Sequence, residues 1–151
     1  CAENMKAADD SLIFKYIVQR VGEDYKYSID FSAKPVKGDW NGSGCHVNFS
    51  TKKMREENGY GEILKAVKKL EAKHQEHIAV YGSDNVDRLT GNHETSDINS
   101  FSYGVADRGC SIRIPRSTIE NQCGYFEDRR PSSSADMYLV TSKLTETCLS
   151  N

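Results

Sequence analysis

The chain has 151 residues, which is enough for a single domain with a sizeable core. Its 20 basic and 22 acidic residues leave a formal net charge of −2, so it lacks the basic surplus on which general nucleic-acid binding depends. No apolar run approaches the roughly 20 residues that span a bilayer, and no signal peptide opens the sequence, so we expect a cytoplasmic protein with neither nucleic-acid nor membrane partners.

The five cysteines are scattered and odd in number, and no two of them form a Cys-x-x-Cys pair. This pattern disfavours a zinc ribbon and a full disulfide framework, so we expect free thiols in a reducing compartment. The sequence begins at Cys1 rather than at a methionine, and we therefore expect it to be the interior of a longer protein.

Helix and strand patterns alternate through the first half of the chain. Asp9-Asp10-Ser11 precede apolar residues that recur every three to four positions from Leu12 to Val21, which predicts a helix of about three turns. The alternation of Tyr27, Ile29 and Phe31 with polar residues predicts a strand. A glycine-punctuated loop then leads into a predicted strand that carries His46. A long amphipathic helix follows, whose apolar face contains Ile63, Leu64, Val67, Leu70 and Ile78.

The second half opens with a polar segment, residues 82–107, that has too little apolar periodicity for a helix or strand. Long loops of this kind tend to be functional or disordered. Residues 111–115 and 125–129 predict two short strands, and residues 135–149 predict a closing helix with Met137, Val140, Leu144 and Cys148 facing inward. The mixture of helices, short strands and long loops predicts an α+β fold.

The run Asn41–Ser50 delivers His46 into a strand behind two glycines. Glycine permits a tight turn and a close approach of a ligand to the backbone. His46 is therefore a candidate metal ligand, although a single histidine in such a place is more often a hydrogen-bonded core residue. Alone, the segment favours the structural interpretation.

Charged residues on the two predicted short strands suggest a polar surface on one side of the sheet. Arg113 lies between Ile112 and Ile114 and so points away from them, into a polar cavity or into solvent, and solvent is the favoured alternative. Glu127 and Arg129 share a face. They could form a structural salt bridge. Glu127 with His46 also offers oxygen and nitrogen ligands that Mg²⁺ or Mn²⁺ accepts, and arginine is a preferred clamp for carboxylate or phosphate.

Residues 88–96 form a second candidate segment. They could be a mobile loop that carries Glu94 over a site with Gly91 as its hinge, or an exposed loop with a solvated glutamate, which is the favoured alternative. Several arginines in polar loops and strands form a charge reservoir of the kind that phosphoryl transfer uses: Arg88, Arg108, Arg113, Arg129 and Arg130.

Two other signals are set aside. Glu71 and His74 have the Glu-x-x-His spacing of di-iron bundles, but no second copy exists, and we expect His74 and His77 to lie on a helix surface. The glycines of residues 41–44 match neither a Walker nor a Rossmann fingerprint.

Five motifs taken in order carry a family resemblance over essentially the whole chain. They are GDWNGSGCHVNFS (38–50), MREENG (54–59), LTGNHETS (89–96), SIRIPR (111–116) and GYFEDRRP (124–131). In sequence and spacing they closely resemble the C-terminal half of the catalytic domain of eukaryotic-type glutamine synthetase.

The resemblance implies an α+β fold in which antiparallel strands line the active site and helices pack outside. It also implies that residues 1–151 form the C-terminal part of that catalytic domain, while an N-terminal β-grasp domain and the first part of the catalytic domain are absent from the chain. The family makes L-glutamine from L-glutamate, ammonia and ATP: the γ-carboxylate is phosphorylated and ammonia then attacks the γ-glutamyl phosphate.

The resemblance further assigns roles to residues. His46 and Glu127 would bind a catalytic Mg²⁺ or Mn²⁺ ion, and Glu94 would close over the intermediate and help to deprotonate the attacking ammonium. Arg88 would hold the α-carboxylate of glutamate, with Arg129 on the γ-carboxyl side. Arg108 and Arg113 would clamp the phosphates of nucleotide and substrate. The other implied positions are Asp39, Trp40, Asn41 and Gly42 at the glutamate, and Asn48, Phe49, Ser50, Tyr125 and Phe126 facing the nucleotide.

The chain departs from the more familiar family pattern at three positions. Asp39 and Asp107 replace asparagines and Asn92 replaces phenylalanine. The two added negative charges lie near the implied glutamate and phosphate positions, so we expect them to alter substrate affinity rather than the type of reaction.

The sequence therefore predicts a glutamate–ammonia ligase that works as a ring-shaped homo-oligomer, a decamer of two pentameric rings, with sites between subunits. Because His46 and Glu127 cannot complete a metal shell, the isolated chain is expected to be inactive. A glutamine-synthetase-like structural protein without turnover is an alternative, against which the retention of His46, Glu94, Arg113 and Glu127 argues. A ligase for another amine is a third alternative.

Overall fold

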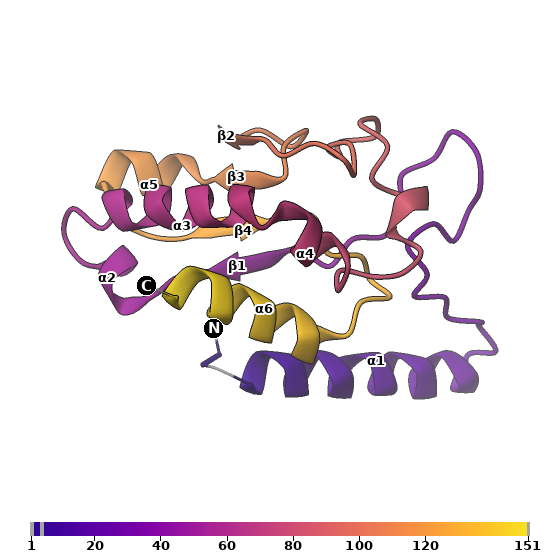
Figure 1. Cartoon of the computed structure of the whole chain (residues 1–151). Coiled ribbons are helices and arrows are strands. Elements are labelled where there is room, and N and C mark those ends of the chain that lie inside the picture. Colours follow the sequence, from indigo (N-terminus) through magenta and orange to yellow (C-terminus); the bar gives the residue numbers. More distant parts are fainter. Residues whose placement is uncertain (1, 4, 151) are drawn as a thin grey trace.

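The computed structural model describes residues 2–3 and 5–150, and it has the predicted α+β composition, with helices packed around one small sheet (Figure 1). The elements are α1 (Lys6–Asp24), β1 (Val47–Phe49), α2 (Lys52–Arg55), α3 (Tyr60–Ala72), α4 (His74–Ile78), the 3₁₀ turn η1 (Asn85–Asp87), β2 (Tyr103–Val105), β3 (Ile112–Ile114), α5 (Arg116–Asn121), β4 (Phe126–Asp128) and α6 (Met137–Leu149).

The sheet has the strand order β1-β4-β3-β2, with β4 at its centre. Strand β4 runs antiparallel to both β1 and β3, and Glu127 lies opposite Asn48 on one side and opposite Arg113 on the other. Cross-strand partners share a face of the sheet. The prediction of antiparallel strands is wrong for β2, which runs parallel to β3. The start of β2 is joined to the start of β3, because the carbonyl of Ser102 accepts hydrogen bonds from the amides of Ser111 and Ile112.

Helices α3 and α6 cover one face of the sheet and pack against each other (Figure 1). The strand residues Ile112, Ile114 and Phe126 are fully buried beneath them. Removal of this apolar surface from water is the main stabilising contribution to the fold. The helix residues that complete the core are Ile63, Ala66, Val67 and Leu70 from α3, and Val140, Leu144 and Cys148 from α6.

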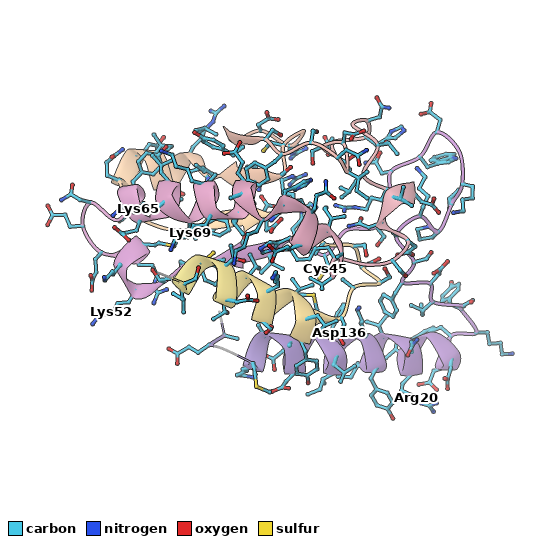
Figure 2. All side chains as sticks on the ribbon, viewed as in Figure 1. Arg20, Cys45, Lys52, Lys65, Lys69 and Asp136 are labelled. Atoms are coloured by element: carbon cyan, nitrogen blue, oxygen red, sulfur yellow. The ribbon has the colours of Figure 1, made fainter. Side chains whose placement is uncertain are left out.

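The predicted closing helix at residues 135–149 is confirmed by α6, Met137–Leu149. Val140, Leu144 and Cys148 are buried, and Met137 is partly buried against the core. Asp136, labelled in Figure 2, begins the helix by accepting a hydrogen bond from the amide of Tyr138 at 2.9 Å. Cys45, Cys110, Cys123 and Cys148 are free thiols as expected, whereas Cys1 lies outside the described residues.

Two predictions for the N-terminal segment need correction. Helix α1 begins at Lys6, so Asp9-Asp10-Ser11 lie inside its first turns instead of capping it; Lys6 is instead paired with Asp10 one turn on, at 2.7 Å. The predicted strand at residues 27–31 is irregular, because none of the described strands pairs with it. Apolar alternation without a partner strand does not make a strand.

The long predicted helix is interrupted, and the prediction that its two histidines lie on the surface is wrong. Lys73 leaves the helical conformation, so α3 ends at Ala72 and α4 begins at His74. The break redirects the next turn, and His74 and His77 are buried rather than on a helix surface. Three short elements within predicted loops, α2, β2 and α5, also lacked a periodic signal because each has six residues or fewer.

A buried polar network explains why these histidines can lie inside. Arg130 donates from Nε and Nη2 to the two oxygens of Asp128, at 2.9 and 2.7 Å, and both side chains are completely buried. Tyr81 donates its hydroxyl proton to Asp128 at 2.7 Å, so His77, whose Nδ1 lies 2.6 Å from the same hydroxyl, must be its donor. His77 Nε2 then accepts from Thr147 at 2.9 Å. His77 is therefore neutral with its proton on Nδ1.

Within the described residues, none of the helices combines the length and the apolar content that crossing a lipid bilayer requires.

Helix α1 lies beside α6 (Figure 1) and carries large apolar side chains that are exposed. It is tethered by Lys15, which donates to the carbonyl of Ser133 at 2.6 Å, and by Asp9, which accepts from Tyr138 at 2.6 Å. Six large apolar side chains along it are nonetheless exposed: Leu12, Ile13, Phe14, Tyr16, Ile17 and Val21. This number of large exposed apolar side chains on one helix favours association.

We expect the pH dependence of stability to report the buried state of His77. Burial and the Arg130 charge lower the pKa of His77 from 6.5 to about 4, so between these values the unfolded chain binds the extra proton and the free energy of unfolding falls as the pH falls. The loss by pH 4 is on the order of 3 kcal/mol. Denaturant titrations followed by circular dichroism from pH 7.5 to pH 4 would measure it.

His77→Gln is the matched control for this pH dependence, because it keeps polar atoms beside Tyr81 and Thr147 but does not titrate. Burial also lowers the pKa of His74, so the slope with pH is expected to decrease without vanishing. A slope that is unchanged by His77→Gln would contradict the assignment.

We also expect substitution on the exposed face of α1 to reduce association. Ile17→Glu removes a half-exposed apolar side chain and should lower the self-association and dye binding of the 151-residue chain, while its free energy of unfolding stays within about 0.5 kcal/mol. Light scattering and chemical denaturation are the measurements. Gln19→Glu adds the same charge to α1 without removing apolar surface, and an equal effect of both variants would refute the explanation.

Candidate active site

Strand β4 separates two sets of charged residues by simple alternation. Asp128 and Arg130 point toward the core network, whereas Glu127 and Arg129 point to the opposite face. The neighbouring strands add Arg113 to that second face, opposite Glu127. The sheet thus positions a carboxylate between two cationic side chains. The strand pattern predicted the shared face of Glu127 and Arg129, but not the pairing with Arg113.

Glu127 is the centre of this cluster. Its Oε1 lies 2.9 Å from His46 Nδ1 and 3.0 Å from Arg129 Nη1, and its Oε2 lies 2.5 Å from Arg113 Nε. The prediction that Arg113 faces solvent is therefore wrong: its side chain is 31 % exposed and pairs with a buried carboxylate. His46 reaches Glu127 because the chain before β1 follows β4 closely, as Cys45 donates its amide proton to the carbonyl of Pro131 at 2.9 Å.

Arg88 approaches the same histidine from the other side. Its Nη2 lies 3.3 Å from His46 Nε2, and its guanidinium donates to the carbonyls of Arg129 at 2.8 Å and Arg130 at 3.1 Å. Glycines make room for it: a Cβ atom at Gly44 would stand 2.5 Å from Arg88 Nη2, and one at Gly42 would stand 2.6 Å from Arg88 Cγ. Any side chain at these two positions would push the guanidinium out of place.

His46 is neutral in this arrangement. Burial lowers its pKa, and the charges of Arg129 and Arg88 lower it further against the opposing effect of Glu127. The carboxylate of Glu127 can only accept, and its Oε1 is the nearest partner of Nδ1, at 2.9 Å, so the single ring proton lies on Nδ1. Nε2 then accepts from Arg88, and Arg129 Nη1, which lies 3.4 Å from Nδ1, donates to Glu127 instead. Both ring nitrogens of His46 thus have hydrogen-bond partners in this structure, and its role as a metal ligand stays a prediction.

The cluster carries an excess of positive charge. The guanidiniums of Arg88, Arg113 and Arg129 surround a single carboxylate, Glu127. Arg88 is buried, and no carboxylate of the described residues lies within ion-pair distance of it. Burial, followed by the charge of Arg129, lowers the pKa of Arg88 to about 10. A buried cation without an anionic partner is costly, so this arrangement favours an anionic ligand.

Glu127 and His46 would fit two ligands of a divalent cation that takes the place of the proton on His46 Nδ1, because this nitrogen lies 2.9 Å from Glu127 Oε1. Glu127 Oε2 is buried without a hydrogen bond, since its contact with Arg113 lacks hydrogen-bond geometry. An ionised carboxylate and a neutral imidazole are suitable donors for such an ion. No group of three or more histidine, cysteine or acidic side chains among residues 2–3 and 5–150 could hold a metal, so these two would be a partial ligand set.

The loop of residues 88–96 contacts this cluster, and a hydrogen bond joins its two ends. Thr95 donates to the carbonyls of Arg88 at 3.2 Å and Asn92 at 2.7 Å, and the carbonyl of Glu94 accepts from Arg129 at 3.3 Å. The Glu94 side chain is exposed and lies 3.3 Å from Arg108 Nη1. Gly91, His93 and Glu94 all have positive φ, of 79°, 53° and 60°. For His93 and Glu94 this conformation is strained.

The predicted glutamate segment lies next to that loop. Asp39 is almost fully exposed and pairs with His93 at 3.0 Å, so one of the departures from the family pattern contacts the loop that carries Glu94. Trp40 and Asn41 are exposed. A cavity of ≈ 320 Å³ opens between the two segments, lined by Lys34, Lys37, Gly38, Asp87, Thr90, Asn92 and His93, but none of the residues around Glu127 lines it.

The predicted nucleotide positions divide between surface and core. Asn48 and Tyr125 are exposed, and Ser50 accepts from Arg55 at 2.8 Å. Phe126 is fully buried against Phe49, with ring centroids 5.5 Å apart, so only its backbone is available to a ligand. Sequence reasoning missed Asn85, a buried residue beside Arg88, because a single asparagine in a polar loop carries no periodic or motif signal.

Comparisons with known proteins show which family the chain is similar to. A family model described as glutamine synthetase, catalytic domain, matches residues 1–150. The chain is 57 % identical over 145 residues to a glutamine synthetase of Yarrowia lipolytica, covering 96 % of this chain and 40 % of that protein. It is 54 % identical over 145 residues to a cytosolic isozyme of Medicago sativa (96 % and 41 %), and 54 % identical over 147 residues to a glutamine synthetase of Schizosaccharomyces pombe (97 % and 41 %).

The chain spans about two fifths of the length of these curated relatives. The family match nevertheless extends over nearly every residue, including the cluster around Glu127. The chain belongs to the glutamine synthetase family, and it corresponds to part of the family's catalytic domain.

Proposed function

We propose that the full-length protein containing this chain is a glutamate–ammonia ligase that forms L-glutamine from L-glutamate, ammonia and ATP. The observation that carries the proposal is the buried guanidinium of Arg88, which has only neutral acceptors and therefore suits an anionic substrate. The relatives that are named glutamine synthetase, at 54–57 % identity, support the same reaction.

Two arginines would bind the two carboxyl groups of glutamate. Arg88 would bind the α-carboxylate of glutamate together with the segment Asp39 to Gly42, and Arg129 would hold the γ-carboxyl group, which places a nucleophilic oxygen beside the nucleotide. A charge-assisted hydrogen bond to an arginine fixes the position of a carboxylate. For Arg88 the donor would be Nε, because the protons of Nη1 and Nη2 already go to four neutral acceptors. Arg129 is suited to the γ-carboxyl group because its Nη1 is already held by Glu127 and its Nη2 by the Glu94 carbonyl.

The first chemical step transfers the γ-phosphoryl group of ATP to the γ-carboxylate of glutamate. Negative charge accumulates on the transferred group, and Arg113 and Arg108 would stabilise it. Asn48, Phe49, Ser50, Tyr125 and the backbone of Phe126 would contact the nucleotide. A Mg²⁺ or Mn²⁺ ion held by His46 and Glu127 would supply further charge stabilisation, with its other ligands coming from outside the described residues.

In the second step ammonia attacks the acyl phosphate and inorganic phosphate leaves. Glu94 would accept the proton that ammonium must lose. Its side chain is exposed and held by Arg108, while its loop packs over Arg129, so movement of this loop would bring the carboxylate over the site and exclude water.

The isolated chain would not complete this site. We propose that the first part of the catalytic domain and a β-grasp domain supply the remaining metal ligands, in a ring-shaped homo-oligomer of two pentameric rings with sites between subunits. Four of the relatives are named cytosolic isozymes, which supports a cytoplasmic location.

The proposed proton acceptor can be tested with two nucleophiles in the full-length protein. We expect Glu94→Gln to lower the rate of ATP-dependent glutamine formation from ammonia by about 10²–10⁴ fold. Hydroxylamine is already neutral at pH 7 and needs no proton removed before it attacks, so formation of the hydroxamate should fall much less. Glu120→Gln, an exposed carboxylate on α5, is the matched control. Absence of any product from the unaltered protein with Mg²⁺ or Mn²⁺ present would overturn the function itself.

The metal assignment has a separate test that needs no turnover. We expect Glu127→Gln to weaken Mn²⁺ binding to the full-length protein by about tenfold or more, because it removes one ligand charge. Paramagnetic resonance of free Mn²⁺ measures this binding. Equal Mn²⁺ affinity in Glu127→Gln and Glu120→Gln would exclude Glu127 as a ligand.

A further inference from the structure

Asn85 is a fully buried polar residue that the proposed chemistry does not use. It lies in the turn η1, three residues before Arg88. Its Nδ2 donates to the carbonyl of Arg130 at 2.7 Å and to the carbonyl of Tyr81 at 3.1 Å, and its Oδ1 accepts from Arg88 Nη1 at 3.2 Å. Each polar atom of its side chain is therefore satisfied by a different segment of the chain.

The contacts around Arg88 share one property, which is that all its acceptors are neutral. They are Oδ1 of Asn85, the carbonyls of Arg129 and Arg130, and Nε2 of a neutral His46. Neutral acceptors orient a guanidinium without cancelling its charge. A carboxylate in the place of the Asn85 amide would form an ion pair with Arg88. The ion pair would compensate the guanidinium charge and weaken its attraction for an anionic ligand.

The neutral acceptors are themselves held by the core. Arg130 is fixed by its two hydrogen bonds to Asp128, and its backbone amide also donates to Asp128, at 3.1 Å. The carbonyl of Arg130 accepts from both Asn85 and Arg88, so these three residues form one rigid unit. Asn85 thus connects the position of Arg88 to the most buried part of the structure.

We propose that Asn85 is a positioning residue that holds the Arg88 guanidinium by neutral contacts and so keeps its charge available for the carboxylate of the amino-acid substrate. The inference rests on the proposed function, because it concerns affinity for glutamate in the same site. It predicts a specific loss of glutamate affinity that leaves the nucleotide affinity unaffected, since no nucleotide-facing position contacts Asn85.

The test uses Asn85→Asp and Asn85→Ala in the full-length protein. We expect Asn85→Asp to raise the KM for glutamate at least tenfold while the KM for ATP changes less than twofold, because the new carboxylate neutralises Arg88. Asn85→Ala is expected to raise the glutamate KM as well, through loss of orientation. Calorimetric binding of L-glutamate provides a readout that does not require turnover, and it should weaken in parallel.

Tyr138→Phe is the control for the loss of a hydrogen bond elsewhere in the fold. Tyr138 on α6 donates to Asp9 on α1 at 2.6 Å and has no hydrogen bond to the network around Arg130, so this variant should lower the Tm without changing the glutamate KM. An equal rise of the glutamate and ATP KM values in Asn85→Asp would indicate a merely structural role and overturn the inference. So would unchanged glutamate binding. Failure of the unaltered protein to form glutamine, by contrast, would overturn the proposed function.

Discussion

The fully buried ion pair between Asp128 and Arg130 is the interaction on which both the core and the candidate site depend. Two charges can lie there because the carboxylate also accepts from Tyr81 and from a backbone amide, while the guanidinium also reaches His74. Loss of one partner would leave an uncompensated charge and cost about 3–5 kcal/mol. The pair is thus a rigid point on β4, one residue away from Glu127 on one side and from Arg129 on the other.

Alternation along β4 and the two residues after it places the charged side chains on opposite faces of the sheet. Consecutive residues 127 to 130 point to opposite faces, so the core face holds a balanced pair and the other face holds an unbalanced cluster. The neutral pair of opposite charges stabilises the protein. The excess of positive charge on the other face favours the binding of an anion, which a substrate can supply. Asp128 and Arg130 therefore stabilise the fold, whereas Glu127 and Arg129 are the residues of this segment that we propose for ligand binding.

The sequence predicted the parts of the molecule that local rules govern. The faces of the strands at Arg113 and Glu127, the closing helix and the motifs that carry the family resemblance all follow from alternation, helical periodicity or residue order. Properties that depend on long-range partners were inaccessible: residues 27–31 alternate like a strand but lack a neighbour, and His77 looks like a surface residue until Tyr81 and Thr147 satisfy its nitrogens. Arg113 was assigned to solvent for the same reason, since its partner Glu127 lies on another strand.

The candidate site combines charged ligands with neutral supports, and the distinction has a physical basis. Arg129 is held by a carboxylate and Arg88 by amide and carbonyl oxygens, although both guanidiniums are buried and both are proposed to hold carboxylate groups of one substrate. An arginine paired with Glu127 has part of its charge already compensated, which suits a group whose charge changes during the reaction. An arginine with neutral acceptors retains its full charge, which suits the α-carboxylate, because that group stays anionic throughout. In this proposal Arg88, held by neutral atoms, would supply binding strength, and Arg129, held by a carboxylate, would contact the group that reacts.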